Sequence, residues 1–423
     1  MTERSNQNAI SVDLADDGDD GDVSGPSSAR PLATSLDQKE DIAQDEYEVA
    51  FSRLLGRGVR AFAFWKGRVA LYAILQALGV GAGDEVLIAG FTCVVVPNAV
   101  RFAGATPVYA DIAPGSYNLD PASAERTITP RTRAMIVQHT LGLPAELDEL
   151  LALAEQQHNL VVIEDCAHTL GSRYRGKHMG MFGDAAFFSS QWSKPYTTGL
   201  GGIAITRNPD LAMRLAKVQQ AFAMPTANAQ RRLSLQYQLY QRFFSPQLYW
   251  FAQGMLRRAG RMGLAVGSSD AIELGGSMSA DHRWRMARAQ RLAGLRQLEG
   301  VPAGINHRRM LATHYDARLG AAGWPIAARD EETVLLRYPV LMRNKQRLLH
   351  AARHARIELG SWFETPLHPM PLSEHAKFGY APGQCPNAEA TAERIVNLPL
   401  HGRVTVDEAD RVLNFLLKHA DRP

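Results

Sequence analysis

The residues best suited to chemistry lie around one lysine. Lys194 stands in the stretch FFSSQWSKPYTTGLGG, residues 187–202, between small hydroxyl residues and a glycine-rich turn. A lysine at such a turn can bind a phosphate group, form a Schiff base with a carbonyl compound, or remain a solvated loop charge. Other residues of the sequence have to decide between these three uses.

An acidic pair ends the apolar run LVVIED. The β-branched residues of this run predict a buried parallel strand that ends at Glu164 and Asp165. Ligands of open α/β sheets bind beyond the carboxyl ends of the strands, so an acid there could bind a metal, bind a ribose or pair with a cationic ring nitrogen. A metal would require further ligands close by, and the sequence offers only His168, so we expect no metal site.

Two common nucleotide-binding motifs are missing. The glycines at 79–83 and 199–202 do not follow a first strand, as the dinucleotide fingerprint G-x-G-x-x-G requires, and the phosphate loop G-x-x-x-x-G-K-[ST] is absent. The remaining interpretation is a Schiff-base lysine with an acid partner, which is what pyridoxal 5'-phosphate (PLP) requires. Lys194 would supply the amine, and Asp165 would supply a carboxylate for the pyridine nitrogen.

The same cofactor needs donors for its phosphate group. The stretch KGRVALYAILQAL predicts a helix that begins at Gly67, with backbone N–H groups available at Arg68 and Val69. Ser189 offers a hydroxyl group five residues before the lysine. His139 ends another predicted strand, and we expect it to pack in the interior.

A resemblance to a known family is carried by residues 163–206, IEDCAHTLGSRYRGKHMGMFGDAAFFSSQWSKPYTTGLGGIAIT. This segment resembles the DegT/StrS family of PLP-dependent sugar aminotransferases. That family shows E-D-x-A-[QH], Y-x-G-K-x-x-G, G-D and F-S-x-x-x-x-K-x-x-T-T-G-x-G-G in this order, and each pattern is present here. The stretches GDEVLIAGFTCVVVPNAVRFAGATPVYADI and CPNAEATAERIVNLPLH are similar to two further family signatures. The resemblance is close over roughly residues 60–205 and loose over roughly 280–420.

The resemblance implies a role for each of these residues. Lys194 would form the Schiff base with PLP and carry the proton between substrate and cofactor carbons. Asp165 would pair with the pyridine nitrogen, and His168 would help to position the cofactor. The residues implied at the phosphate group are Ser189, Gly67, Arg68 and Val69.

The chain departs from the family pattern at several positions. The usual Ser-Gly-Thr phosphate turn is Lys66-Gly67-Arg68 here, which keeps the backbone donors and lets the Arg68 side chain either reach the phosphate or face solvent. Cys93 follows Thr92 where the family has an aromatic residue that stacks on the cofactor ring, and by resemblance it would cover the ring as a smaller residue. The family's Asn-Tyr-Arg run is not found, and Leu200 stands in place of a glutamate.

Helices and strands alternate along the chain after Val69, which predicts a mostly parallel sheet covered on both faces. The resemblance implies the type I PLP-dependent aminotransferase fold, an α/β fold with a large sheet domain and a smaller C-terminal α+β domain. We expect a disordered acidic tail over residues 1–45, a large PLP-binding domain over 46–300 and a small domain over 301–423. A helical aromatic insert occupies about 222–275 within the large domain.

The composition is that of an ordinary soluble globular protein, with 46% hydrophobic and 21% charged residues. A net charge of +3 does not by itself favour nucleic acid or acidic membranes as partners. The three cysteines, Cys93, Cys166 and Cys385, lie far apart, so a disulfide framework is not expected, and we interpret them as small buried residues. The polar N-terminus carries no signal segment, and we expect a cytoplasmic protein.

The predicted insert contains YQLYQRFFSPQLYWF, an aromatic run with basic neighbours. Such a helix could lie on a membrane surface, bind single-stranded nucleic acid, or pack against a partner chain or a substrate entrance. The last interpretation is favoured because large aromatic side chains more often bury against protein. We therefore expect a homodimer without a nucleic-acid partner, with membrane contact through the insert as an open alternative.

The predicted function is transamination. By resemblance, glutamate or glutamine is the amino donor and a nucleotide-linked keto-sugar is the acceptor, in amino-sugar or surface-polysaccharide synthesis. One alternative is another PLP chemistry, such as sugar dehydration, but in that branch of the family a histidine replaces the lysine that is retained here. A second alternative is a PLP-binding regulator without catalysis.

Overall fold

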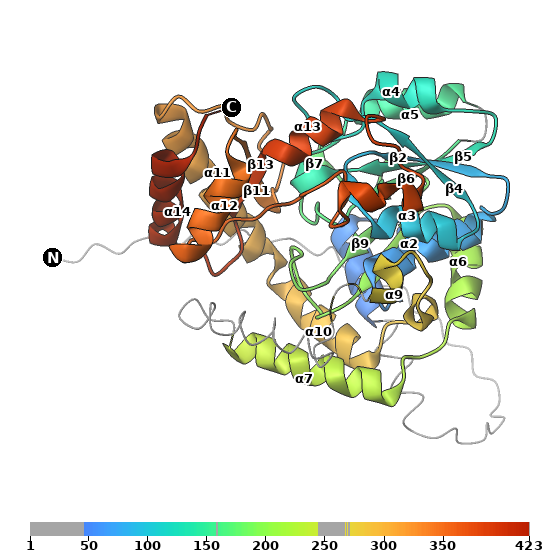
Figure 1. Cartoon of the computed structure of the whole chain (residues 1–423). Helices are drawn as coiled ribbons and strands as arrows, with labels where there is room; N and C mark the ends of the chain where they lie inside the picture. The colour runs from blue at the N-terminus through green and yellow to red at the C-terminus, as the bar shows by residue number, and fades with distance from the viewer. Residues whose placement is uncertain (1–45, 158–159, 244–266, 268, 270, 423) are drawn as a thin grey trace, which may run out of the picture.

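The computed structural model describes residues 46–157, 160–243, 267, 269 and 271–422 (Figure 1). The predicted acidic tail, residues 1–45, lies outside this part of the chain, as does much of the predicted aromatic insert. The described residues form two large hydrophobic cores, one around a large sheet and one in the C-terminal part of the chain.

The large sheet has seven strands. In spatial order they are β1 (Arg60–Phe64), β10 (Gly202–Thr206), β9 (Ala185–Ser189), β6 (Val161–Asp165), β5 (Thr132–Gln138), β2 (Glu85–Ala89) and β4 (Thr106–Ala110). The five strands from β9 to β4 run parallel, while β10 is antiparallel to both β9 and β1. The strands are rich in apolar and β-branched residues because both faces of a parallel sheet are buried. The predicted mostly parallel sheet is confirmed.

Helices cover both faces of this sheet. In Figure 1, α4 (Pro121–Thr127) and α5 (Leu147–Gln156) lie on one side, and α2 (Gly67–Leu78) and α3 (Val95–Phe102) lie on the other. The Asp120 carboxylate caps α4 by accepting hydrogen bonds from the N–H groups of Ala122 and Ser123. α2 ends at Gly79, which takes the left-handed conformation with a φ of 73°.

The C-terminal part builds its own core. It contains α11 (Val301–Ala321), β11 (Arg337–Leu341), α12 (Lys345–His354), β13 (Ile395–Pro399) and α14 (Val406–His419). β11 and β13 pair antiparallel, so the predicted α+β character of this part is confirmed. A short parallel pairing of β12 (Leu367–His368) with β3 (Thr92–Cys93) joins the C-terminal part to the large sheet region. The domain boundary after residue 300 stays a prediction.

α7 (Ala227–Phe243) is the helix of the predicted insert that the structure describes. It follows the outside of the molecule (Figure 1) and contacts the loop that carries Lys194. The Tyr237 hydroxyl donates to the Thr197 carbonyl oxygen at 3.2 Å, and the Tyr240 hydroxyl donates to the Trp192 carbonyl oxygen at 3.4 Å. Among the described helices, none combines the length and apolar character that crossing a membrane requires.

The start of α2 makes close backbone contact with the sheet. A Cβ atom on Gly67 would lie 2.9 Å from the Cβ of Ser189, at the end of β9. A Cβ atom on Gly202, the first residue of β10, would lie 2.2 Å from the carbonyl oxygen of Lys66 and 2.5 Å from the Cα of Gly67. Only glycine permits this approach of backbone to backbone, which brings the N-terminus of α2 beside Ser189.

We predict that Gly202→Ala destabilises the fold by about 3 kcal/mol, because the added methyl group would have to displace backbone atoms. Chemical denaturation of the variant and the wild type measures the difference. Gly304→Ala is the matched control, since a Cβ atom on Gly304 in α11 meets nothing within 4 Å. The control should leave stability unchanged or raise it by up to about 1 kcal/mol. Equal stabilities for Gly202→Ala and the control would contradict the close approach.

Candidate active site

Lys194 lies in the loop between β9 and β10, at the carboxyl edge of β9. Its side chain is half-buried, and burial lowers the pKa of its amine to about 8, while the Asp165 carboxylate acts in the opposite direction. At neutral pH an appreciable fraction of this amine is therefore unprotonated. A neutral amine is the form that attacks a carbonyl carbon.

Asp165 is the last residue of β6 and is buried. Its Oδ1 accepts a hydrogen bond from the Ala167 N–H group at 3.0 Å. Burial raises the pKa of this carboxyl, although the Ala167 hydrogen bond and the charge of Lys194 counteract the rise. A buried carboxylate of this kind gains stability from a cationic partner, such as a protonated ring nitrogen.

His168 borders the same space. Its Nδ1 accepts the N–H of Leu141 at 3.1 Å, so the ring carries its proton on Nε2 when neutral. Burial, with the charges of Lys194 and Arg337, holds the pKa of His168 well below its usual value, which keeps the ring neutral. The imidazole stacks on the indole of Trp362, with ring centres 5.7 Å apart and planes 21° apart.

Some of the groups predicted to bind the cofactor's phosphate lie close together. Ser189 is buried at the end of β9, and the first turn of α2 begins beside it at Gly67. The N–H of Gly67 has no partner within its helix, as at any helix start. The N–H of Val69 was predicted to be available, but it already donates to the carbonyl oxygen of Lys66 at 3.1 Å. The Val69 N–H is therefore already used within the first turn of the helix, and a phosphate group would have to share that donor.

The Arg68 side chain is buried and has an acidic partner. Its guanidinium forms a buried ion pair with Glu273, and its Nη2 also donates to the Ser269 hydroxyl at 3.2 Å. The neighbouring Lys66 is also buried, and its Nζ lies 2.5 Å from Oδ2 of Asp281. Two acids from one distant segment therefore neutralise the two cations that flank Gly67. No local pattern indicates this pairing, because the partners are about 200 residues apart.

Cys93 ends β3 and is half-buried. The parallel pairing with β12 places it opposite His368. Burial raises the pKa of its thiol, so the sulfur stays protonated near neutral pH and is a small packing group, as predicted.

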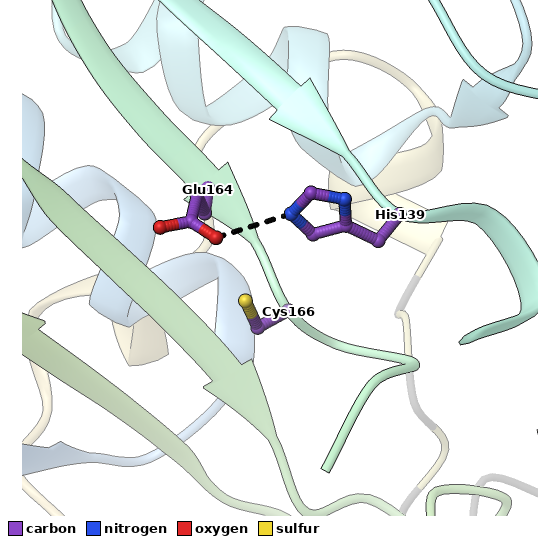
Figure 2. A group of neighbouring side chains, drawn as sticks. All are labelled: His139, Glu164 and Cys166. Carbon is purple, nitrogen blue, oxygen red and sulfur yellow. Dashed lines mark hydrogen bonds and ion pairs between the residues drawn. The ribbon is translucent and has the colours of Figure 1, made fainter. Parts of the chain in front are cut away.

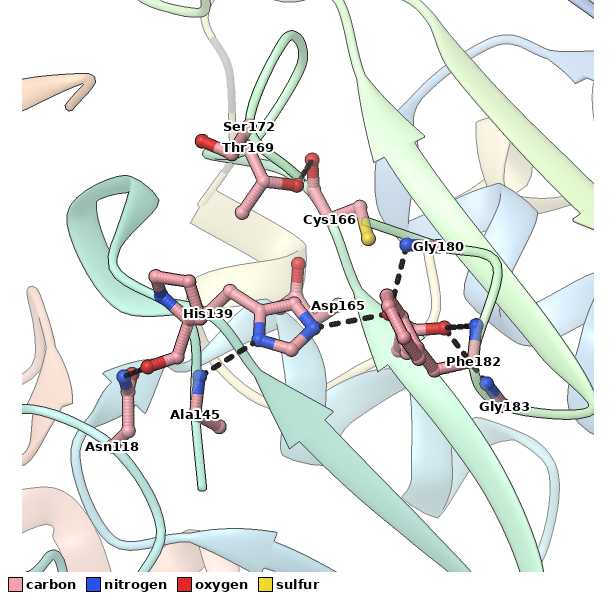
Figure 3. A network of polar contacts seen from close by, with 12 residues as sticks. Asn118, His139, Ala145, Asp165, Cys166, Thr169, Ser172, Gly180, Phe182 and Gly183 are labelled. Atoms are coloured by element: carbon pink, nitrogen blue, oxygen red, sulfur yellow. Dashed lines mark hydrogen bonds and ion pairs between the residues drawn. The ribbon is translucent and has the colours of Figure 1, made fainter. Parts of the chain in front are cut away.

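A second cluster is formed by the buried side chains of His139, Glu164 and Cys166 (Figure 2). The Nδ1 of His139 accepts the Ala145 N–H at 3.1 Å, so its Nε2 donates to Glu164 at 3.2 Å. Both Glu164 oxygens also accept backbone N–H groups, from Gly180 at 2.7 Å and from Phe182 and Gly183 at 2.7 and 2.8 Å (Figure 3). Burial opposes the charge of Glu164, but these hydrogen bonds hold the pKa of its carboxyl below the usual range.

These contacts explain the roles of both side chains. Every ligand atom that His139 and Glu164 could offer a metal is already used in a hydrogen bond. The cluster therefore ties β6 to the loop before β9 and to the loop after β5. His139 packs in the interior, as predicted.

Two residues near Lys194 were missed by the sequence reasoning. The Nζ of Lys194 lies 5.1 Å from the ring centre of Trp362, and the guanidinium carbon of Arg337 lies 4.6 Å from the same centre. Both residues come from the C-terminal part of the chain. The adjacent aromatic residues Trp362 and Phe363 were the available signal, but nothing local indicates that they reach Lys194.

Comparison with known proteins shows the family. Residues 40–417 match the sequence model of the DegT/DnrJ/EryC1/StrS aminotransferase family. The chain belongs to this family. It is an aminotransferase, and the predicted family and fold are both confirmed.

Individual relatives differ in what they act on. The chain is 32% identical to GDP-perosamine synthase of Caulobacter vibrioides over 380 residues, which cover 88% of each protein. It is 41% identical to L-glutamine:scyllo-inosose aminotransferase of Streptomyces griseus over 177 residues, which cover 42% of this chain and 41% of that one.

A solved structure of S. venezuelae DesV in complex with a ketimine intermediate is similar over 92% of this chain and 96% of DesV, with 26% identity and a TM-score of 0.69. Spr1654 of Streptococcus pneumoniae, solved in a PLP form, covers 92% of this chain and 96% of its own, with 20% identity and a TM-score of 0.69. At that identity the second likeness concerns the fold alone.

We predict that Lys194 in cofactor-free protein titrates with a pKa of about 8. Asp165→Asn should lower this pKa further, because the Asp165 carboxylate favours the charged ammonium group. Competitive acetylation at a series of pH values, read by mass spectrometry, measures the reactivity of each lysine. The exposed Lys217 on α6 (Pro209–Ala221) is the internal reference and should not respond to the substitution. A Lys194 that titrates near the ordinary lysine value of about 10.4 would contradict the assignment.

Proposed function

We propose that this aminotransferase binds PLP at Lys194 and moves an amino group from glutamine or glutamate to a keto-sugar or a related cyclic ketone. The observation that carries the proposal is that the Lys194 amine, whose pKa is lowered, lies within the electrostatic influence of the buried Asp165 carboxylate at the carboxyl edge of the sheet. This pairing offers one group for a carbonyl carbon and one for a cationic ring nitrogen.

The residues present fit the cofactor. When bound, PLP supplies an electrophilic carbonyl and an electron-accepting ring. Asp165 would hold the ring nitrogen in its protonated form, and the neutral His168 would help to position the cofactor. Ser189 and the Gly67 N–H would hold the phosphate group. Lys194 would take up and return protons at its Nζ, which a pKa near neutrality allows.

The substrate class is supported by the relatives. GDP-perosamine synthase and L-glutamine:scyllo-inosose aminotransferase name a nucleotide-linked sugar and a cyclitol, and the second names glutamine as the donor. Because the first match spans most of both chains and the second less than half, we favour a nucleotide-linked keto-sugar as the acceptor. A role in amino-sugar or surface-polysaccharide synthesis and a cytoplasmic location stay predictions.

The retained lysine separates this function from its alternatives. By resemblance, the dehydratase branch of the family has a histidine at this position. The chain has Lys194 instead, which favours transamination. A regulator without catalysis would not need the amine's pKa to lie near neutrality.

We predict that purified protein loaded with PLP shows a visible absorption band, and that L-glutamine or L-glutamate shifts this band to about 330 nm without any acceptor. Transfer of the amino group to the cofactor in the first half of a two-step reaction is the reason. Lys194→Ala should abolish the shift, because the proton carrier is lost. Lys217→Ala, at an exposed lysine of α6, is the control and should respond like the wild type. An absorption shift at the wild-type rate in Lys194→Ala would contradict this role of the lysine.

We also propose a homodimer that uses the outer face of α7. Leu235, Leu239 and Phe243 repeat at four-residue intervals on this helix and are exposed by 59%, 47% and 44%. Such a row of large apolar side chains favours contact with another protein surface.

Leu239→Glu should weaken the dimer about tenfold or more, because it places a charge in an apolar contact. Sedimentation velocity over a range of concentrations measures the change. The exposed neighbour Gln238 provides the control, and Gln238→Glu should leave the dimer unchanged. Equal association of both variants would exclude this face of α7 as the dimer contact.

A further inference from the structure

Lys194 ends a tight turn that begins at Gln191. The Lys194 N–H donates to the Gln191 carbonyl oxygen at 3.0 Å, and Trp192 lies inside the turn, two residues before the lysine. Both side chains leave the same four-residue unit, so the placement of Trp192 restricts the direction of the Lys194 side chain. The indole Nε1 has no hydrogen-bond partner among the described residues, so ring contacts determine how Trp192 lies.

One face of α7 supplies these ring contacts. Leu233, Tyr237 and Tyr240 follow the helical spacing, and this face meets the loop between β9 and β10. The ring centre of Trp192 lies 5.0 Å from that of Tyr240 and 6.3 Å from that of Tyr237. A Cβ atom on Gly199 would lie 3.1 Å from Cδ1 of Leu233 and 3.1 Å from the indole of Trp192. The far end of the loop therefore packs against the same helix.

The Tyr237 hydroxyl binds the loop backbone after Lys194. It accepts a hydrogen bond from Nε2 of Gln241 at 2.8 Å and donates to the Thr197 carbonyl oxygen at 3.2 Å. A hydroxyl group carries one proton, so a bond accepted from a side-chain donor leaves that proton for the carbonyl oxygen. Burial raises the pKa of Tyr237, so the hydroxyl keeps its proton at neutral pH.

The Tyr240 hydroxyl binds the loop backbone before Lys194 in the same way. It accepts a hydrogen bond from Nη1 of Arg403 at 3.1 Å and donates to the Trp192 carbonyl oxygen at 3.4 Å. Arg403 lies between β13 and α14, so Tyr240 joins three segments that are distant in the sequence. The loop is therefore bound by α7 on both sides of Lys194.

Other parts of the loop are anchored without α7. The hydroxyl groups of Tyr196 and Tyr47 form a hydrogen bond of 2.7 Å, and both side chains are buried. The hydroxyl groups of Ser190 and Thr198 form another, of 2.8 Å. Because these contacts lie in the interior, loss of the α7 contacts would loosen the turn locally and leave the rest of the loop folded.

We propose that α7 positions Lys194 for the reaction, an inference that rests on the proposed transamination. Tyr237 and Tyr240 are positioning residues, which keep the lysine amine within the field of the Asp165 carboxylate and away from bulk water. Moving a reacting group by about 1 Å can lower a rate about 100-fold. The two tyrosines therefore act on the rate through the lysine and not through the substrate.

The first test needs no cofactor. Competitive acetylation compares the wild type with the double variant Tyr237→Phe/Tyr240→Phe, which keeps both rings and loses both hydroxyl donors. A looser turn admits water, so the pKa of Lys194 should rise from about 8, and its neutral fraction at pH 7 should fall about threefold or more. Tyr174→Phe is the matched control, because it also removes one tyrosine hydrogen bond, of 2.9 Å to Asp148.

The second test uses PLP-loaded protein and its absorption change with L-glutamine. The double variant should bind PLP about tenfold more weakly, and its maximal rate should fall about tenfold or more, which is the loss expected for two hydrogen bonds. The half-saturating concentration of L-glutamine should change less than about twofold, because the substrate contacts are untouched. The single variants Tyr237→Phe and Tyr240→Phe should each show part of the loss, and they serve if the double variant does not fold.

Two outcomes would overturn the proposal. One is an unchanged acetylation of Lys194 together with an unchanged PLP affinity in all three tyrosine variants. The other is a raised half-saturating concentration of L-glutamine at an unchanged maximal rate, which would make α7 a wall of the substrate entrance. A wild-type protein that responds to no amino donor would refute the proposed function, whereas acetylation decides the positioning without cofactor or substrate.

Discussion

Lys194 and Asp165 carry opposite charges at the carboxyl edge of the sheet, and burial acts on both of them. Burial favours the neutral amine and the neutral carboxyl, whereas their mutual attraction favours the charged forms. The pKa of the Lys194 amine falls to about 8 because the effect of burial outweighs the attraction of the Asp165 carboxylate. A wetter site would return the amine to its ordinary protonated state, and a site without Asp165 would leave a cationic cofactor ring without a partner. The surrounding structure therefore has to exclude water and still provide fixed polar groups.

The glycine contacts at the start of α2 meet the second of these needs, the fixed polar groups. Gly67 and Gly202 let the helix start and the first residue of β10 approach within a distance that no side chain would allow. This approach brings backbone donors and Ser189 together on the side of the site where a phosphate group is expected. The ion pairs of Lys66 with Asp281 and of Arg68 with Glu273 then allow two cations to be buried at that helix start. A buried cation without such a partner would be costly.

The C-terminal core meets the first need, the exclusion of water. Arg337 on β11 and Trp362 in the segment before β12 lie near Lys194, and the β3–β12 pairing fixes that core to the region of Cys93. The family's aromatic cover is absent at Cys93, yet an aromatic ring from the C-terminal part stands beside the lysine. Aromatic surface near the amine is thus supplied by a different segment from the one that the family pattern indicates.

The sequence by itself determined the mostly parallel sheet and the family, and its motifs are the source of the roles proposed for Lys194 and Asp165. These features depend on local periodicity or on fixed spacings within one segment, so they can be read along the chain. Only the tertiary structure decided which distant groups surround the site. In the folded protein the Val69 N–H donates to the Lys66 carbonyl oxygen, Arg68 pairs with Glu273, and Trp362 and Arg337 lie near Lys194. The physical reason is that ion pairs and ring contacts join segments far apart in the chain, and no local pattern specifies which side chain will arrive.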